Sequence, residues 1–577
     1  MSDFESHIHD VLIIGAGPCG LAVAARLRES TPSALFTESE HQKFHFMKAS
    51  SSRQNPSSKP IRSSRRANTA PDRFLPGHDV SNHDLDIAVL DANGDKWMSS
   101  WNEKFDDLGI SHLRSPMFFH PDPRDRDGLL EFAVREGREA ELKEITGVVG
   151  KELSKHQRKK KMKDGNKRPQ ETTYIDERDR HDYFRPSQAL FKDYCNSIVA
   201  RYDLSNLIQK AEVKSISYSS TSSIFTLQTL TGIKKARIVV LAIGAAAKPS
   251  LPPDCPFCNL SPNESVAHVF SKNHHEGQNK DNFSTTSNLN STILPPSLLS
   301  KAKLGIPTSI AIIGGGLTSA QIAHLASQYG ITKTHLLLRG PLKTKHFDID
   351  LSWLAKFKNH NMSAFWKADS DGERVEMMKA ARGGGSVNPE YRGILKGLAE
   401  RGGLYVREYT EVVGAVWDEG VEVWGLEVEE KGTGKKEQIV VDHVVYATGV
   451  VADINCLEAV KPLLASHPIE TVGGMPCLTK ELMWNEEVPF FITGRLGGLR
   501  LGPAAPNLEG ARLGAEFIAG KIASLVHKLD RAVVDEVSEE VDMRRLGLGR
   551  QNQFEVLELN GIDSDDELEI SAARAML

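Results

Sequence analysis

The sequence has few cysteines and no long apolar run. Six cysteines in 577 residues do not make the disulfide framework of a small secreted protein. No stretch approaches the roughly 18 apolar residues of a membrane-spanning helix. No basic segment precedes the short apolar run near the N-terminus, so this run does not predict a signal peptide. We therefore expect a cytoplasmic protein without a transmembrane segment, with another intracellular compartment as the alternative.

An excess of charge of one sign is also absent. The net charge is −5 and the pI about 6.5, and 40% hydrophobic with 25% charged residues is an ordinary composition for a globular protein. These values require neither nucleic acid nor a membrane surface as a partner, and we expect no nucleic-acid partner. The length predicts roughly two to four domains, and it leaves the oligomeric state open.

Metal-binding and redox motifs are scarce. Cys255 and Cys258, in the sequence CPFC, are the one close cysteine pair. A structural zinc site needs a second pair of ligands, and a lone CxxC is weak evidence for redox chemistry. We therefore expect no metal site and interpret the pair as part of a loop, with a redox role as the alternative.

Four polar segments interrupt the globular composition. Residues 48–80 are rich in Ser, Arg and Pro, residues 151–171 are strongly basic, residues 271–300 are rich in Ser and Asn, and residues 529–577 are acidic. Low hydrophobicity and high charge predict two exposed insertions, a flexible linker and a tail. The basic run also fits a nuclear-localisation or polyanion-binding patch, although a solvated loop is the simpler interpretation.

A glycine turn follows the first apolar run of the chain. Residues 11–14 have the length of a buried strand, GAGPCG follows at residues 15–20, and apolar residues continue through a helix at residues 21–27. A second short strand at residues 34–37 ends at Glu38. The order strand, glycine turn, helix, strand and acid is the fingerprint of a dinucleotide-binding βαβ unit.

Each position in this pattern has a physical reason. Gly15 makes the tight turn, Gly17 lets the backbone approach a pyrophosphate, and Gly20 lets the helix pack closely on the strand. The helix N-terminus offers free N–H groups to the phosphates, and Glu38 can accept hydrogen bonds from the adenosine ribose. We predict cofactor contacts at Gly15, Gly17, Pro18, Gly20 and Glu38.

The same order of elements returns later in the chain. Residues 309–313 form the strand, residues 314–319 the turn GGGLTS, and residues 320–329 the helix. The next strand, residues 335–338, ends at Arg339 instead of an acid. The sequence therefore predicts a second dinucleotide unit with a basic strand end.

The basic strand end favours NADPH. An acid there would repel a 2′-phosphate, whereas Arg339 can bind it with two charge-assisted hydrogen bonds. Ser319 replaces the third glycine and is still small enough for close packing. A surface arginine without this role is the alternative. We predict cofactor contacts at Gly314, Gly316, Thr318, Ser319, Arg339 and Lys343.

Two such units predict an α/β protein with two Rossmann-like dinucleotide-binding domains. The acid-ended first unit suits the adenosine end of FAD and the basic second unit suits NADPH, an arrangement that serves hydride transfer from nicotinamide to flavin. We expect the NADPH domain to be inserted into the FAD domain. The expected division is residues 8–270 for the first part of the FAD domain, 271–300 for the linker, 301–440 for the NADPH domain, 441–528 for the closing part of the FAD domain and 529–577 for the tail.

Two glycine-ended strands resemble those of a known family. Residues 237–244 and 442–450 resemble the strands at which the chain crosses between the FAD and NADPH domains of two-dinucleotide-binding flavoproteins. DHVVYATGV at residues 442–450 resembles the D-x3-(L/F)-ATG-Y signature of the lysine and ornithine N-hydroxylase family, with Tyr446 in the Leu/Phe place and Val450 in the Tyr place. The resemblance covers most of residues 10–525. It implies cofactor contacts at Thr448 and Gly449.

Shorter fragments resemble the same family. Residues 97–101 and 108–113 resemble its segment near flavin and substrate, residues 268–271 its short His-Ser stretch, residues 386–391 its Asn-containing segment, and residues 494–510 its closing turn over the flavin. A helix starting near the end of this last segment would aim N–H groups at the flavin pyrimidine edge. The resemblance implies a catalytic role for Asn388 and cofactor contacts at Trp101, His112, Asn507 and Leu508.

Structural roles are the alternative for four residues of these fragments. Trp97 and Trp101 lie four residues apart and fit a core face equally well. His112 fits a structural histidine, and Asn388 precedes a proline and so fits a turn.

The resemblance implies an FAD- and NADPH-dependent monooxygenase. NADPH would reduce FAD, and the reduced flavin would react with O2 to give a C4a-hydroperoxide that oxygenates a small-molecule substrate, with nitrogen as a candidate atom. The flavin supplies this chemistry, so the absence of a side-chain dyad or triad in the sequence does not argue against it. The alternatives are an O2-independent NADPH flavin reductase or disulfide oxidoreductase, and a non-catalytic flavoprotein regulator.

Overall fold

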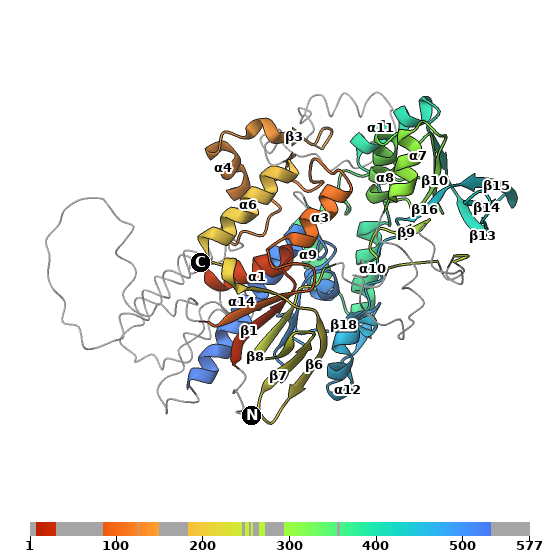
Figure 1. Ribbon diagram of the computed structural model, residues 1–577. Helices are drawn as coiled ribbons and strands as arrows, with labels where there is room; N and C mark the ends of the chain where they lie inside the picture. The colour runs from red at the N-terminus through yellow and green to blue at the C-terminus, as the bar shows by residue number, and fades with distance from the viewer. Residues whose placement is uncertain are drawn as a thin grey trace, which may run out of the picture.

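The structure is a computed structural model, and it divides into two α/β units, each built around one larger sheet (Figure 1). It describes residues 7–29, 85–124, 126–148, 183–244, 249–252, 255–257, 265–271, 293–354 and 358–531. Several predicted features lie outside these residues, namely Glu38, Cys258, the segments 48–80 and 151–171, and most of 271–300 and 529–577.

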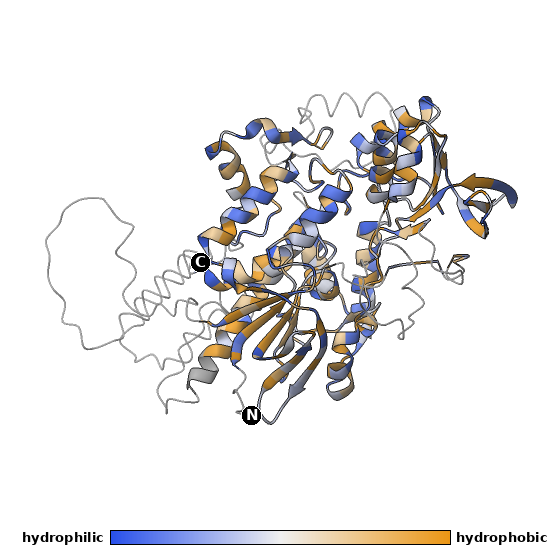
Figure 2. Cartoon of the chain, viewed as in Figure 1, coloured by the Kyte–Doolittle hydropathy of each residue, from blue (hydrophilic) through white to orange (hydrophobic). Residues whose placement is uncertain are grey.

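The first sheet has a parallel part that continues into an antiparallel meander. Its strands, in spatial order, are β5 (Ile208–Lys210), β2 (Ile87–Asp91), β1 (Ile8–Ile14), β8 (Gly232–Leu241), β7 (Ile224–Thr229) and β6 (Val213–Ser219), with β19 (Phe490–Ile492) also paired to β8. The central strands β1 and β2 and the second half of β8 are apolar and buried (Figure 2). Helices α1 (Pro18–Arg28) and α14 (Leu508–Arg531) pack against each other, so both ends of the described chain contribute to this unit.

The strand beside β1 is not the predicted one. Val11 pairs with Ile87 of β2 on one edge of β1, and Ile238 of β8 pairs on the other edge. Both edges of β1 are therefore occupied, and β2, which ends in Asp91, has the place that we predicted for residues 34–37 and Glu38. The sequence also contains a signal for this strand, because IAVLD at residues 87–91 is an apolar run that ends in an acid.

The second sheet is entirely parallel. Its strands, in spatial order, are β12 (Leu404–Arg407), β11 (Lys333–Leu337), β10 (Ser309–Ile313), β16 (His443–Tyr446) and β9 (Val266–His268). Alternate residues of β10 face opposite ways, as expected for a strand. Ile310 and Ile312 pack with α7 (Pro296–Lys303), α8 (Leu317–Gln328) and α11 (Pro389–Glu400), whereas Ala311 packs with the antiparallel sheet β13 (Thr410–Asp418), β14 (Val423–Glu430) and β15 (Lys435–Val441).

The remaining elements surround these two sheets. Ranked by position in the chain, they are α3 (Ser99–Asp107), α4 (Gly128–Arg135), β3 (Leu142–Glu144), β4 (Phe184–Pro186), α6 (Gln188–Arg201), α9 (Lys358–Trp366), α10 (Asp371–Arg382), α12 (Lys461–Ser466), β17 (Thr471–Val472), β18 (Met475–Pro476) and α13 (Gly498–Leu501). In the part of the chain that is described, no helix combines the length and apolar character needed to cross a bilayer.

The second unit is an insertion in the first. The chain leaves the first sheet after β8 and re-enters it at β19, where Phe490 pairs with Val239. This confirms the predicted α/β fold with one Rossmann-like domain inserted into another. The inserted sheet extends beyond the predicted NADPH domain on both sides. Strand β9 precedes the predicted border at residue 270 and β16 follows the one at residue 441, yet both strands belong to the inserted sheet.

Three buried histidines should make the inserted sheet sensitive to acid. Burial lowers the pKa values of His268, His335 and His443 to about 4, so the unfolded chain takes up protons at these positions before the folded chain does. Stability is then lost as the pH falls from about 6.5 to about 4, by roughly 3 kcal/mol for each histidine. Hydrogen exchange should show β9, β11 and β16 losing protection in this range before β1 and β8, and equal protection of both sheets at pH 4.5 would contradict this.

Candidate functional site

The first glycine turn joins β1 to α1. Gly15 has φ +108°, and a Cβ there would lie 2.5 Å from the carbonyl oxygen of Ala242. A Cβ on Gly20 would lie 2.0 Å from the carbonyl oxygen of Gly15. A Cβ on Gly17 would meet no described atom within 4 Å. The protein itself therefore requires Gly15 and Gly20, whereas Gly17 borders open space.

This open space lies at the N-terminus of α1. Pro18 is the first helical residue, no side chain caps the helix at Gly17, and the first turn carries no acid. The free N–H groups of such a helix end attract an anion. The arrangement fits a dinucleotide pyrophosphate above Gly17, as the sequence predicted.

The acid at the end of β2 fixes the same turn from the other side. Asp91 is buried, and its Oδ2 accepts a hydrogen bond from Ala16 N at 2.8 Å. Its Oδ1 accepts from Asn93 N at 2.8 Å and from Gly94 N at 3.2 Å. Asp91 therefore places a negative charge at the end of the strand next to β1, where an adenosine ribose is bound in folds of this kind.

The second glycine turn repeats this geometry between β10 and α8. A Cβ on Gly314 would lie 2.5 Å from the carbonyl oxygen of Ala447, and a Cβ on Gly316 would meet no described atom within 4 Å. Ser319 is buried and donates from Oγ to the carbonyl oxygen of Gly316 at 2.6 Å, so its hydroxyl is accommodated where the first unit has glycine. Thr318 lies half-buried in the first turn of α8.

A further loop packs directly on the second turn. A Cβ on Gly385 would lie 3.0 Å from Gly316 N, so a larger residue would have to push the loop away from the turn. Ser386 is buried, and Asn388 caps α11 by accepting from Tyr391 N at 2.9 Å. The loop thus places Asn388 three residues beyond its contact with the second glycine turn. Gly385 is not among the predicted site residues, although the run of three glycines before Ser386 is a signal in the sequence.

Arg339 and Lys343 follow β11 and differ in their contacts. Arg339 is exposed, and no hydrogen bond or ion pair of its side chain is found among the described residues. Lys343 donates from Nζ to the carbonyl oxygen of Gly383 at 2.7 Å. Arg339 is therefore available to a ligand, while Lys343 supports the loop that covers the second turn.

Arg339→Ala should weaken NADPH binding by roughly 10- to 150-fold, because a charged hydrogen bond contributes about 1.5–3 kcal/mol. NADH, which has no 2′-phosphate, should bind with nearly unchanged affinity. Dissociation constants of both nucleotides, measured by fluorescence titration, test this. Equal losses for NADPH and NADH would instead indicate general damage to the site.

The chain just beyond the first predicted crossing segment lies beside the end of the second. Pro249 and Val450 form an antiparallel bridge, and Ser250 N donates to the carbonyl oxygen of Gly449 at 3.0 Å. Thr448 donates from Oγ1 to the carbonyl oxygen of Ser250. Thr448 and Gly449 therefore tie together the outgoing and returning strands of the insertion.

The predicted flavin-side aromatic residues lie on and beside α3. Trp97 is buried and donates from Nε1 to the carbonyl oxygen of Leu204 at 3.0 Å, which is a core role. Trp101 stacks on Phe105 with ring centroids 4.9 Å apart, and its buried Nε1 has no partner in the described part of the chain. His112 is half-buried, and its pKa is lowered by burial and by nearby cationic side chains.

Arg114 joins the first unit to the inserted unit. Its guanidinium donates to the carbonyl oxygens of Lys345 (2.8 Å), His346 (3.0 Å), Phe347 (2.8 Å) and Ser386 (3.3 Å), and to Ser386 Oγ (3.0 Å). Burial lowers the pKa of Arg114 to about 10, so it is charged at neutral pH. We call these contacts the Arg114 clamp.

The closing helix contacts the clamped segment. Asn507 donates from Nδ2 to Asp348 Oδ1 at 3.1 Å, and Arg382 donates to Asp348 Oδ2 at 2.9 Å. Leu508 is buried and begins α14. Since Asp348 directly follows the clamped residues 345–347, the predicted residues of the closing helix and of the loop before α11 are connected through the clamp.

Comparison with known proteins identifies the family. Residues 167–467, which are more than half of the 577, match the model of a family described as pyridine nucleotide-disulphide oxidoreductase. The chain belongs to this family. The prediction of an oxidoreductase is therefore confirmed. No curated protein matches the sequence.

Solved structures share the fold of this family member at low identity. Each comparison covers 90% of this chain. The ornithine N-hydroxylase of Kutzneria sp. 744, with reduced FAD, NADP+ and L-ornithine, has 15% identity, a TM-score of 0.56 and 100% of its own chain covered. The reduced ornithine hydroxylase of Pseudomonas aeruginosa has 15% identity and a TM-score of 0.55, with 100% of its own chain covered. The FAD-bound cadaverine monooxygenase of Erwinia amylovora has 14% identity and a TM-score of 0.54, with 95% of its own chain covered. The predicted resemblance to N-hydroxylases is thus confirmed for the fold, and the predicted cofactors, FAD and NADPH, agree with those of these complexes.

Proposed function

We propose that this chain is an FAD- and NADPH-dependent monooxygenase that oxygenates a small molecule at nitrogen. The observation that carries the proposal is the pair of open glycine cradles, at Gly17 and Gly316, in one chain. Each cradle lies at an uncapped helix N-terminus, which is the arrangement that binds a dinucleotide pyrophosphate. Two cradles provide for two dinucleotides and therefore for hydride transfer between them.

The charges at the strand ends assign one cofactor to each cradle. Asp91 gives the first cradle an acid for the adenosine ribose of FAD, and Arg339 gives the second a cation for the 2′-phosphate of NADPH. Bound FAD would accept the hydride of NADPH and react with O2. The chain's own residues would bind both cofactors, hold the substrate amine and exclude water.

Two features support oxygenation over simple reduction. The fold is that of ornithine and cadaverine hydroxylases, whose substrates carry primary amines. In addition, the Arg114 clamp holds the loop with Asn388 against the first unit. We infer that Asn388 contacts the substrate and the nicotinamide ribose there, and that α14, which begins at Leu508, directs its N–H groups toward the flavin.

A disulfide reductase is the alternative that the family name favours. Such an enzyme needs a reactive thiol, which is a thiolate at neutral pH. Burial raises the pKa of Cys19 to about 12, and Cys255 is buried with its Sγ 3.3 Å from the hydroxyl of Tyr446. A variant with both Cys255→Ser and Cys258→Ser should therefore keep full NADPH turnover, and loss of turnover would favour the reductase.

Product analysis tests the oxygenation directly. We would incubate the enzyme with FAD, NADPH and air, together with ornithine, lysine or cadaverine, and record O2 uptake with and without catalase. The proposal predicts a product that has gained one oxygen atom, seen by mass spectrometry, and O2 uptake that catalase does not return. NADPH consumption that yields only hydrogen peroxide with every amine would count against an amine substrate, and absence of NADPH oxidation would favour a non-catalytic regulator.

Asn388→Ser separates the capping role of Asn388 from a catalytic one. Serine also caps helices, so the free energy of unfolding should change by less than about 0.5 kcal/mol, whereas Asn388→Ala should cost about 1 kcal/mol. If the amide contacts substrate, Asn388→Ser should still lower kcat/KM about tenfold or more, since a hydrogen bond is lost. Wild-type kinetics in Asn388→Ser would show that Asn388 is only a helix cap.

A further inference from the structure

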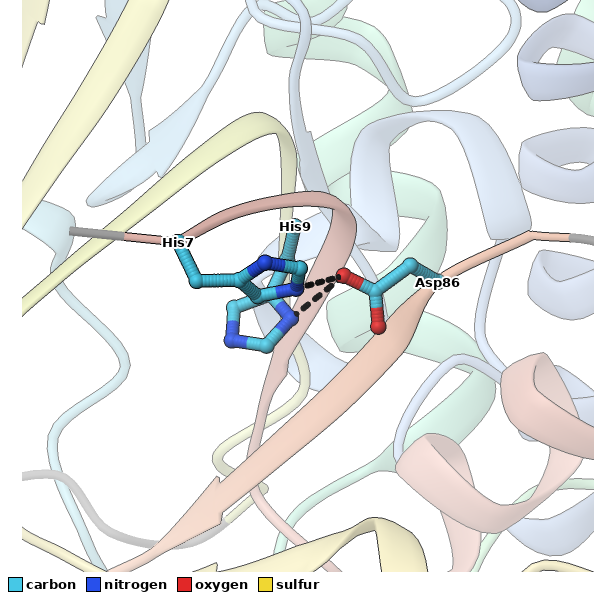
Figure 3. A group of neighbouring side chains, drawn as sticks. All are labelled: His7, His9 and Asp86. Carbon is cyan, nitrogen blue, oxygen red and sulfur yellow. Dashed lines mark hydrogen bonds and ion pairs between the residues drawn. The ribbon is translucent and has the colours of Figure 1, made fainter. Parts of the chain in front are cut away.

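Three side chains with metal-binding atoms meet at the amino ends of β1 and β2 (Figure 3). His7 Nε2 lies 2.6 Å and His9 Nδ1 lies 2.8 Å from the same atom, Oδ2 of Asp86. The three ligand atoms all lie within 4.8 Å of one another, and no other group of three or more such side chains among the described residues meets this condition.

The backbone holds these side chains together. Residues two apart in an extended strand point to the same side, so His7 and His9 share one face at the start of β1. Asp10 N and Val11 N both donate to the carbonyl oxygen of Asp86 at 3.1 Å, and Asp86 N donates to Asp10 Oδ2 at 3.1 Å. Parallel pairing therefore positions the carboxylate beside the two imidazoles without any help from an ion.

We propose that His7, His9 and Asp86 bind a divalent zinc ion. Two imidazole nitrogens and one carboxylate oxygen are a ligand set that open zinc sites use, with water completing the coordination. The side chain of His9 is 14% exposed, whereas those of His7 and Asp86 are 70% and 41% exposed. One ligand is thus anchored against the sheet, and the other two leave room for water.

The site is remote from the dinucleotide cradles. His9 precedes Gly15 by six residues of extended chain, which span about 20 Å. A bound ion would instead connect β1 to β2 across a sequence separation of 77 residues. Because the ligands are assembled only in the folded chain, zinc binding would stabilise the fold. The sequence predicted no metal site because the third ligand, Asp86, lies 77 residues from His9 and only the pairing of β1 with β2 brings it to the two histidines.

Calorimetry on the tag-free, full-length protein tests the site. After treatment with a chelator, the wild type should bind one zinc ion per chain in a titration with zinc chloride, and zinc should raise Tm. His9→Ala and Asp86→Asn should each weaken zinc binding at least about tenfold and remove the rise in Tm, because each deletes one ligand. His360→Ala, which removes an exposed histidine of α9, should bind zinc like the wild type.

Without added zinc, His9→Ala and Asp86→Asn should match the metal-free wild type in flavin content and Tm. This match would establish that both variants are folded. Absence of zinc binding to the wild type would overturn the proposal. So would unchanged binding in His9→Ala and Asp86→Asn, because the three side chains would then form only a hydrogen-bonded surface cluster.

Discussion

Gly17→Ala is expected to leave the protein folded and to remove its flavin. The new Cβ meets no described atom within 4 Å, so the chain has room for it. It would occupy the space into which the pyrophosphate must come, and we expect FAD affinity to fall by roughly 100-fold or more, or about 3 kcal/mol. The ratio of absorbance at 450 nm to that at 280 nm, with circular dichroism as the test of folding, measures both effects.

Two further glycine variants serve as controls. Gly316→Ala should bind FAD normally and lose NADPH, because its Cβ also points into open space, in the second cradle. Gly20→Ala should damage folding itself, because its Cβ would lie 2.0 Å from the carbonyl oxygen of Gly15. A Gly17→Ala protein that retains a full complement of FAD would show that the first cradle does not bind this cofactor.

Arg114→Ala should weaken the connection between the inserted unit and the first unit. The substitution removes five hydrogen bonds to Lys345, His346, Phe347 and Ser386. Since partly buried carbonyl groups lose their donors, we expect a loss of about 3 kcal/mol in the free energy of unfolding. The rate of flavin reduction by NADPH should fall as well, because the loop that carries Asn388 loses its anchor. Urea unfolding and anaerobic stopped-flow absorbance measure the two effects.

Arg114→Lys should restore little of this loss, because an ammonium cannot reproduce the planar set of donors of a guanidinium. Arg135→Ala is the matched control. Arg135 makes exposed ion pairs with Glu131 and Glu136 and lies over the ring of Phe132, contacts that together should contribute no more than about 1 kcal/mol. If Arg114→Ala and Arg135→Ala had equal stability and equal reduction rates, the clamp would have no role in joining the two units.

The glycine turns could be predicted from the sequence because their requirements are local. A turn, a close approach and a helix start are all encoded within six residues, so Gly15, Gly17 and Gly20 were recognised with their separate roles. The same reasoning recognised Ser319 as a substitute for glycine. The same locality leaves the strand beside β1 ambiguous, because residues 34–37 and residues 87–91 both fit the local pattern. Only the pairing of Val11 with Ile87 decides between them.

Contacts between segments that are distant in the chain have no local sequence pattern from which they could be predicted. Arg114 binds backbone carbonyls, which every residue has, so nothing in the sequence of residues 345–347 marks them as its partners. The bond between Asn507 and Asp348 and the cluster of His7, His9 and Asp86 likewise depend on segments that only the fold brings together. The sequence could therefore predict where each cofactor binds, but not how the two binding units are held against each other.

The most direct test of two cofactors in one chain is the visible spectrum of the purified protein during anaerobic mixing with NADPH, followed by mixing with air-saturated buffer. We predict bound flavin with absorbance near 450 nm that NADPH bleaches, faster than NADH does. On mixing with O2, an absorbing species should appear before the oxidised spectrum returns. A protein that neither contains nor takes up FAD, or one whose flavin NADPH does not reduce, would contradict the account.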